Sequence, residues 1–123
     1  MRAAAQRQSS ERSGRRGESL AAWWLRFKGY RILARRFKAP TGEIDLVALR
    51  GENLVFVEVK ARSTLELAAQ ALGTRQQQRL IQGARLFLTR HPRFASHTIR
   101  FDLMLIAPGR LPRHMVQAFD AYF

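Results

Sequence analysis

The sequence predicts an α/β domain built on a mixed β-sheet of about five strands flanked by helices. Five segments are rich in β-forming residues, and two others carry apolar residues at helical spacing. Their order along the chain is α, β, β, β, α, β, β, which is typical of a mixed sheet covered by helices. With 123 residues, 46% of them hydrophobic, the chain suits one folded core. We therefore expect residues 17 to 123 to form a single domain.

The N-terminal segment, MRAAAQRQSSERSGRR (residues 1 to 16), differs in composition from the rest. It holds five Arg and one Glu, and no large apolar residue follows Met1. Such a composition predicts a disordered basic arm.

The first helix is expected over residues 17 to 28, GESLAAWWLRFK. Leu20, Trp24 and Phe27 fall at i, i+4 and i+7, which predicts that they form its apolar face. Adjacent positions on a helix cannot both point into the core. We therefore expect Trp24 in the core and Trp23 at its edge or in a partner interface.

Three strands should follow this helix. A turn at residues 40 to 42 (PTG) separates the first from the second, and residues 50 to 53 (RGEN) join the second to the third. A short loop with a Gly between β-rich segments is a strong signal for a hairpin. The predicted strands are YRILARRF at 30 to 37, EIDLVAL at 43 to 49 and NLVFVEVKA at 53 to 61.

The second half of the chain begins with residues 61 to 73, which fit either a loop or a short helix. Thr74 can cap a helix over about 75 to 90, which should end at His91-Pro92. Two further strands are expected, at 97 to 106 (HTIRFDLMLI) and in the C-terminal segment MVQAFDAYF. The apolar stripe of the helix consists of Leu80, Ala84, Phe87 and Leu88, with Ile81 beside it.

Charge restricts the partners more than the fold. Lys and Arg number 22 and Asp and Glu 9, which gives a net charge of +13 and favours a polyanion such as nucleic acid. An anionic membrane surface and a bias in genome base composition are the alternative explanations. Without Cys, disulfides, thiolate metal sites and a Cys nucleophile are excluded. No segment predicts a secretory signal or a membrane span, so we expect a cytoplasmic protein.

Three charged side chains stand inside the predicted hairpin. Side chains alternate along a strand, so Glu58 and Lys60 point to one face. If Arg50 pairs with Asn53 across a two-residue turn, Asp45 lies directly opposite Glu58 and shares that face. A register slip of one residue would disperse the cluster.

Two carboxylates beside an ammonium group can perform a specific chemistry. Close carboxylates repel one another in surroundings poor in water, and a hard divalent cation relieves this repulsion. Asp45 and Glu58 could thus hold Mg²⁺ or Mn²⁺, while Lys60 orients a water or stabilises charge on a phosphate. The structural alternative is that both carboxylates form ion pairs with Lys60 or an Arg and merely order the sheet.

These residues resemble a known superfamily, the PD-(D/E)xK nucleases with the restriction-endonuclease-like fold. The sequence is more closely similar to the YraN family, small bacterial proteins regarded as predicted endonucleases and similar to archaeal Holliday junction resolvases. Four segments carry the resemblance: GE at 17 to 18 with AA at 21 to 22, GEID at 42 to 45, FVEVK at 56 to 60 with Arg62, and RFD at 100 to 102.

The resemblance implies roles for individual residues. Asp45, Glu58 and Glu18 would be catalytic metal ligands, and Lys60 the catalytic base that orients water. Without the resemblance, Glu18 would only complement the dipole of its helix. Two features depart from the pattern: Ile44 stands where the superfamily has Pro, and TRQQQ at 74 to 78 lacks the Lys that the family often carries.

Other polar residues are assigned by position. We expect Asp102 to make structural hydrogen bonds and the three His to lie at the surface, because their spacing fits no metal site. Basic residues near the cluster are predicted to contact nucleic acid, and Arg75 or Arg79 could replace the charge of the missing Lys. The predicted contacts are Arg35, Arg36, Arg62, Arg75 and Arg79.

The sequence therefore predicts a metal-dependent endonuclease that hydrolyses phosphodiester bonds in DNA, with branched or repair intermediates as substrates. A resolvase acting on a two-fold junction would be expected to form a homodimer. Two alternatives stay open. One is a nucleic-acid-binding module that keeps the nuclease fold without cutting, and the other is a basic protein that docks on RNA or a protein partner.

Overall fold

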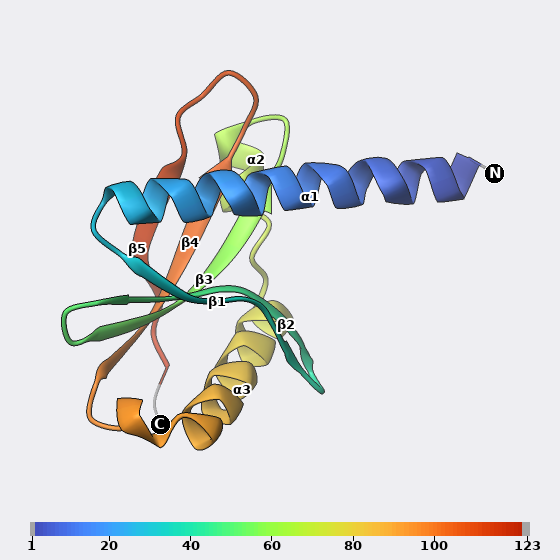
Figure 1. Cartoon of the computed structure of the whole chain (residues 1–123). Helices are drawn as coiled ribbons and strands as arrows, with labels where there is room; N and C mark the ends of the chain where they lie inside the picture. Colours follow the sequence, from blue (N-terminus) through green and yellow to red (C-terminus); the bar gives the residue numbers. More distant parts are fainter. Residues whose placement is uncertain (1, 122–123) are drawn as a thin grey trace.

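The computed structural model describes residues 2–121, with side chains from residue 15 onward, and contains a five-stranded sheet with helices on both faces (Figure 1). The elements are α1 (Arg2–Phe27), β1 (Arg31–Ala39), β2 (Gly42–Arg50), β3 (Asn53–Ala61), α2 (Leu65–Ala69), α3 (Thr74–Arg90), the 3-10 helix η1 (Pro92–Phe94), β4 (Thr98–Ile106) and β5 (Arg113–Phe119).

The sheet follows the order of the chain, β1-β2-β3-β4-β5. All neighbouring strands are antiparallel except β3 and β4, which are parallel. A parallel pair needs a crossover, and α2 and α3 supply it. In Figure 1, α1 crosses one face of the sheet and α3 covers the other. The predicted mixed sheet of five strands flanked by helices is therefore confirmed.

The hairpin of β2 and β3 has the register on which the predicted cluster depends. Arg50 pairs with Asn53, and the pairing continues to Leu46 opposite Val57. Gly51 has a φ of 59°, which two-residue hairpin turns of type II′ require at their first position. Only Gly adopts this conformation without strain, so the turn fixes the register.

Each face of the sheet has its own apolar core. On one face α3 packs Leu80, Ala84 and Phe87 against the sheet. On the other face α1 contributes small residues and one Leu, and the strands contribute alternate residues that point away from α3. This second core contains Ala21, Ala22, Leu25, Tyr30, Leu46, Ala48, Val55, Val57 and Met104.

Helix α1 differs from the prediction in its buried face. Its fully buried residues are Ala21, Ala22 and Leu25, whereas Leu20 is 42% and Phe27 84% exposed. This face of α1 lies in contact with β3: a Cβ atom on Gly17 would stand 3.4 Å from the Cβ atom of Ala61, an ordinary van der Waals distance. Trp24 is partly buried and Trp23 is 69% exposed, as predicted.

The ends of several elements also differ from the prediction. Helix α1 begins at Arg2 rather than at residue 17. Because side chains before residue 15 are not described, the basic arm and the domain boundary after residue 16 stay predictions. Gly73, not Thr74, precedes the first turn of α3, while Thr64 caps α2 by accepting a hydrogen bond from the N–H of Leu67 at 3.1 Å.

The C-terminal strand lies earlier than expected. It covers Arg113–Phe119, and the last two residues of the predicted segment lie outside the described part of the chain. Within that part, no helix combines the length and the apolar character that crossing a membrane demands.

Candidate functional site

Strand β3 brings Glu58 and Lys60 to the face of the sheet that α3 covers. Both residues are buried, with 7% and 9% of their surface exposed. Lys60 Nζ lies 3.6 Å from Glu58 Oε1, so the two form an ion pair. Leu54 and Phe56 precede them on the same face within the apolar core. The strand therefore holds two charged groups at the edge of a core, where water is scarce.

Asp45 joins the cluster because β2 separates from β3 at this residue. The paired register ends at Leu46 opposite Val57, and Asp45 Oδ2 instead accepts a hydrogen bond from the backbone N–H of Val59 at 2.7 Å. The side chain thus replaces the missing strand partner. It lies beside Glu58, as the register predicted.

Strand β1 is distorted at the same level. Its pairs Arg35–Leu46 and Phe37–Ile44 place Arg36 opposite Asp45. Arg36 has a φ of 53°, a left-handed conformation that is uncommon for residues other than Gly. Such strained residues are frequent at functional sites. Next to this distortion, Ile44 of β2 packs against α3.

Burial and mutual repulsion change the acidity of the two carboxyl groups. Burial, followed by the charge of Asp45, raises the pKa of Glu58 to about 8, and Lys60 only partly opposes this. Burial also raises the pKa of Asp45, against the hydrogen bonds from Val59 and Glu58. Glu58 therefore retains a proton near neutral pH and donates it in a hydrogen bond to Asp45.

Helix α3 adds a residue that the sequence analysis did not identify. Gln76 Nε2 donates a hydrogen bond of 3.3 Å to Glu58 Oε1 from the first turn of the helix. The resemblance to the family draws attention to this segment only for its missing Lys and for the charges of Arg75 and Arg79. The polar run TRQQQ at the start of an otherwise apolar helix was the available signal.

Glu18 of α1 stands near the cluster but has its own partner. Arg36 Nε lies 2.7 Å from Glu18 Oε2, and this hydrogen bond raises the pKa of Arg36. The negative charge of Glu18 also acts to raise the pKa of Asp45. Among the described residues, no group of three or more His, Cys, Asp and Glu side chains could hold a metal. The role of Glu18 as a third ligand stays a prediction.

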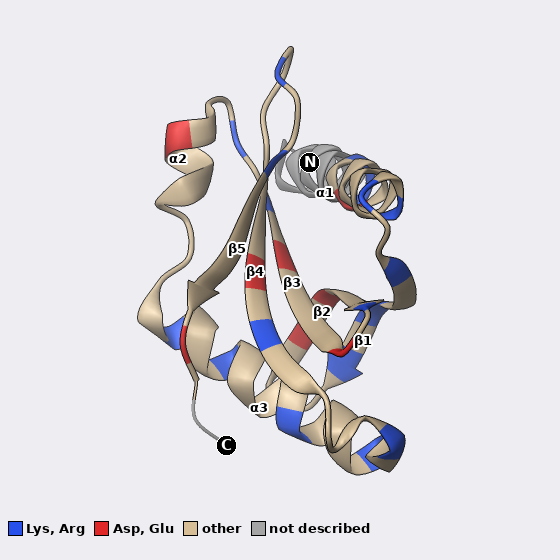
Figure 2. Cartoon of the chain, turned by 90° about the vertical axis from the view of Figure 1, so that its left-hand side faces the viewer, with Lys and Arg blue, Asp and Glu red and all other residues tan. Residues whose placement is uncertain are grey.

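The predicted nucleic-acid contacts have different environments. Arg35 Nη2 donates to Ser19 Oγ at 3.0 Å, and Arg62 Nη1 donates to the carbonyl oxygen of Ala61 at 2.7 Å. Arg75 and Arg79 lie exposed on α3. Figure 2 shows acidic positions within the sheet on β2, β3 and β4, with basic positions on α1 and α3 around it. Arg36, bound to Glu18, is the least available of the five.

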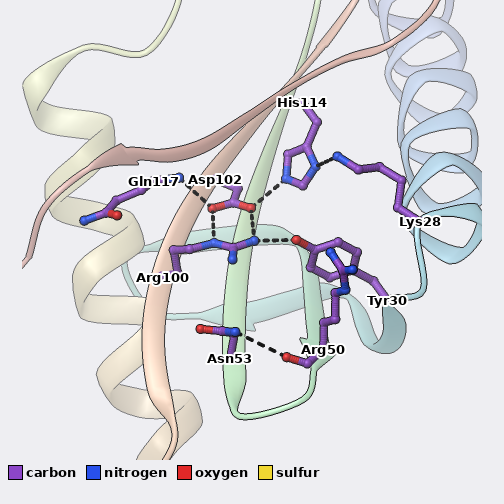
Figure 3. Close-up of polar contacts among 8 residues, drawn as sticks. All are labelled: Lys28, Tyr30, Arg50, Asn53, Arg100, Asp102, His114 and Gln117. Atoms are coloured by element: carbon purple, nitrogen blue, oxygen red, sulfur yellow. Dashed lines mark hydrogen bonds and ion pairs between the residues drawn. The ribbon is translucent and has the colours of Figure 1, made fainter.

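A second polar cluster lies on the α1 side of the sheet (Figure 3). Arg100 binds both oxygens of Asp102, at 2.8 and 2.7 Å, and Gln117 donates its backbone N–H to Asp102 Oδ1 at 2.9 Å. Burial acts to raise the pKa of Asp102, but hydrogen bonds from His114, Arg100 and Gln117 outweigh it and lower the pKa. The predicted structural role of Asp102 is confirmed.

His114 corrects the expectation that every His is a surface residue. Its side chain is 2% exposed, and Nε2 lies 2.6 Å from Asp102 Oδ2. Lys28 Nζ lies 2.6 Å from Nδ1. An ammonium group donates and cannot accept, so Nδ1 accepts from Lys28 and Nε2 donates to Asp102. His114 directly precedes the predicted C-terminal segment MVQAFDAYF, and the spacing of His residues carries no signal for its burial in β5.

The donor set of the first cluster fits a hard divalent cation. Burial raises the pKa of both Asp45 and Glu58, and the negative charge of Asp45 raises that of Glu58 further. A cation between the two carboxyl groups would favour the charged form of each. Mg²⁺ typically takes one or two carboxylates and keeps several waters. Two carboxylates are therefore sufficient ligands, and soft or imidazole-preferring metals find no suitable donors in the cluster.

Comparison with known proteins identifies the family to which the chain belongs. The profile of a family described as "Uncharacterised protein family UPF0102" matches residues 17–106. The chain belongs to UPF0102. This is the family called YraN above. The matched residues include α1 from Gly17 onward and all strands through β4, hence both carboxylates and Lys60.

UPF0102 relatives cover nearly the whole chain. A UPF0102 protein of Bradyrhizobium diazoefficiens is 53% identical over 97% of this chain and 90% of its own length. One from Rhodopseudomonas palustris (strain BisB18) is 55% identical over 97% and 88%. One from Nitrobacter winogradskyi is 56% identical over 89% and 92%. Their names state the UPF0102 family and no activity.

Proposed function

We propose that the protein is a metal-dependent endonuclease that hydrolyses phosphodiester bonds in DNA. One observation carries this proposal: Asp45, Glu58 and Lys60 meet in a buried cluster at the point where β2 leaves β3. A purely structural role accounts poorly for the cluster, because burial and the nearby charge of Asp45 destabilise the charged form of Glu58.

Each residue of the cluster would have a different role in the reaction. Asp45 and Glu58 would hold Mg²⁺ or Mn²⁺, which supplies charge neutralisation and polarises the phosphate when bound. Lys60 can orient the attacking water, accept its proton or stabilise negative charge on the phosphate. Gln76 fixes the Glu58 carboxyl group through its hydrogen bond to Oε1.

The overall charge supports nucleic acid as the substrate. A net charge of +13 draws a polyanion toward the protein and raises the rate of encounter. Arg75 and Arg79 lie exposed on α3, the helix that also carries Gln76. Branched DNA and a homodimer remain the finer proposals that follow from the resemblance to junction resolvases.

The test is a cleavage assay on labelled linear, flap and four-way DNA with Mg²⁺ or Mn²⁺. Lys60→Ala and Asp45→Asn should each reduce cleavage by at least about 100-fold, because each removes a group that acts on the reacting phosphate or its metal. Asn keeps an oxygen that can accept from the N–H of Val59, so the fold should survive.

Glu43→Gln is the matched control, since Glu43 is an exposed carboxylate on β2, the strand that also carries Asp45. It should cleave like the wild type. Equal cleavage by the wild type and by both cluster variants would refute the assignment. Salt-dependent DNA binding without product under any divalent ion would instead favour the non-catalytic binding module.

A further inference from the structure

A stripe of apolar side chains on α1 is only partly covered by the core. Leu20, Trp24 and Phe27 have helical spacing, yet Phe27 is 84% and Leu20 42% exposed. They line two adjoining hollows between α1 and the loop that joins β4 to β5, and both hollows include Gly109, Arg110 and Leu111 of that loop. The hollows measure about 750 and 660 Å³.

We call this surface the α1 groove. It consists of Arg16, Leu20, Trp24 and Phe27 on one side and Arg110 and Leu111 on the other. From Arg16 to Lys28 it follows roughly 18 Å of helix at about 1.5 Å per residue. In Figure 1 the β4–β5 loop passes α1 and extends beyond it.

The charged residues that line the groove are basic, and no acidic residue among them offsets their charge. Arg16, Lys28, Arg62, Arg110 and Arg113 line the hollows, and neither hollow is lined by any Asp or Glu. In the described part of the chain, none of the four Arg makes an ion pair. Positive charge thus borders the whole groove and calls for an anionic occupant.

The floor of the groove adds apolar and aromatic surface. Phe27 stacks on Trp24 with ring centroids 6.1 Å apart, and Leu111 on the opposite wall is 74% exposed. Aromatic side chains bind unpaired bases by stacking, without preference for sequence. Duplex DNA offers its phosphates but keeps its base faces stacked inside, so it would use only the charges.

A single strand matches both properties, since it carries phosphates for the Arg residues and base faces for Trp24 and Phe27. A second copy of this chain would place like charges together across the groove, which disfavours it. The occupant that fits charge and shape together is therefore single-stranded nucleic acid.

The groove begins at the end of β3, the strand that carries Glu58 and Lys60. Arg62, which lines it, follows Lys60 by two residues on the same chain segment. Gly17 packs on Ala61 at the end of β3, and the next residue, Glu18, pairs with Arg36 near Asp45. A strand that passes the cluster could therefore continue into the groove along α1.

We propose that the α1 groove binds a single-stranded segment of DNA next to the position of cleavage. The choice of DNA rests on the proposed function. The inference specifies the substrate: DNA in which a duplex adjoins an unpaired strand.

The test measures binding rather than cleavage, so it does not depend on activity. Fluorescence anisotropy in EDTA compares labelled oligo(dT) with a duplex of equal length, using the full chain. Phe27→Ala and Arg110→Ala should each weaken single-strand binding about 10-fold, in line with ~1–3 kcal/mol for one stacked base. Phe27→Ala should change duplex binding less than about twofold.

Two control variants carry substitutions of the same kinds at exposed positions outside the groove. Val116→Ala removes an apolar side chain that is 51% exposed on β5, and Arg93→Ala removes an exposed charge from η1. Both should bind oligo(dT) within about twofold of the wild type. Because all four residues are exposed, the variants should keep the fold.

Several outcomes overturn the inference. Unchanged oligo(dT) binding in Phe27→Ala is one, and equal losses in groove and control variants are another. Binding of oligo(U) with no affinity for oligo(dT), or a dimer that Phe27→Ala dissociates without changing DNA affinity, would assign the groove another occupant. If Phe27→Ala and Arg110→Ala lose single-strand binding while the wild type shows no cleavage, the groove is supported as a binding site and the nuclease proposal is refuted.

Discussion

At the scale of single residues, Glu58 has the most altered chemistry in the candidate site. Its carboxyl group is buried beside that of Asp45, and its pKa is raised to about 8. Lys60 and Gln76 both contact Oε1, at 3.6 and 3.3 Å. These contacts fix the position of the carboxyl group but only partly offset the loss of water around it. The site is therefore least stable in the charged form that metal binding requires.

The raised pKa of Glu58 predicts how the stability of the protein depends on pH. In the metal-free protein the pKa of Glu58 is about 8 in the folded state and near 4.5 in the unfolded state, so the folded state binds more protons between these values. The free energy of unfolding should therefore fall as pH rises from about 4.5 to 8. The midpoint temperature of thermal unfolding in EDTA, measured between about pH 4.5 and 8, tests this prediction.

Glu58→Gln is the control for this prediction. Gln does not titrate, so its midpoint temperature should vary less with pH over the same range. Mg²⁺ should raise the midpoint of the wild type at pH 8 and leave that of Glu58→Gln nearly unchanged. A wild-type midpoint that rises steadily from pH 4.5 to 8 in EDTA would contradict the raised pKa.

At the scale of elements, the contact of α3 with the hairpin of β1 and β2 holds Asp45 in place. Gly83 on α3 faces Ile44, the residue before Asp45. A Cβ atom on Gly83 would lie 2.8 Å from Cδ1 and 3.1 Å from Cγ1 of Ile44. The helix can approach β2 only because residue 83 has no side chain.

Gly83→Ala therefore sets two effects against each other. Ala favours the helix by about 1 kcal/mol, but overpacking beside a buried Ile costs about 1–3 kcal/mol. We expect a net loss of about 1 kcal/mol in the free energy of unfolding, measured by urea denaturation. Cleavage should fall as well, because Ile44 and Asp45 are adjacent.

The double variant Gly83→Ala with Ile44→Val separates these effects. Val lacks the Cδ1 atom, so the double variant should regain stability relative to Gly83→Ala alone. The stability loss caused by Ile44→Val should be smaller in the Gly83→Ala background than in the wild type. Equal losses in the two backgrounds would show that the contact between residues 83 and 44 does not limit packing.

At the scale of the whole molecule, Asp102 connects parts that are distant in sequence. It is 1% exposed on β4 and accepts hydrogen bonds from β5 through His114 and Gln117. Arg100 extends the network to the hydroxyl of Tyr30 at 2.6 Å, and Lys28 joins it through His114. One carboxylate thus links the end of α1 to the far edge of the sheet.

Asp102→Asn should destabilise the whole fold, because it removes a fully buried carboxylate from the partly buried Arg100. The expected loss is about 3–5 kcal/mol, typical of removing one partner from a buried pair. Glu52→Gln, an exposed change in the hairpin turn, should alter stability by less than about 0.5 kcal/mol. A loss below about 1 kcal/mol in Asp102→Asn would indicate that the network contributes little.

The sequence by itself determined most of the fold and the centre of the site. Alternating residues in β3 and the Gly-containing turn after Arg50 placed Asp45, Glu58 and Lys60 together, because strand geometry has a strict period of two. The stripe of α3 was equally readable, because it spans the helix without interruption. Such local patterns need no knowledge of distant segments.

Only the tertiary structure decided what packs against what. Of the periodic stripe Leu20, Trp24 and Phe27, only Trp24 packs against the core, because α1 turns its face of Ala21, Ala22 and Leu25 toward the sheet. Likewise, the ion pair of Glu18 with Arg36, the contact of Gln76 with Glu58 and the burial of His114 join residues that no local pattern connects. The physical reason is that burial and pairing depend on neighbours across the fold.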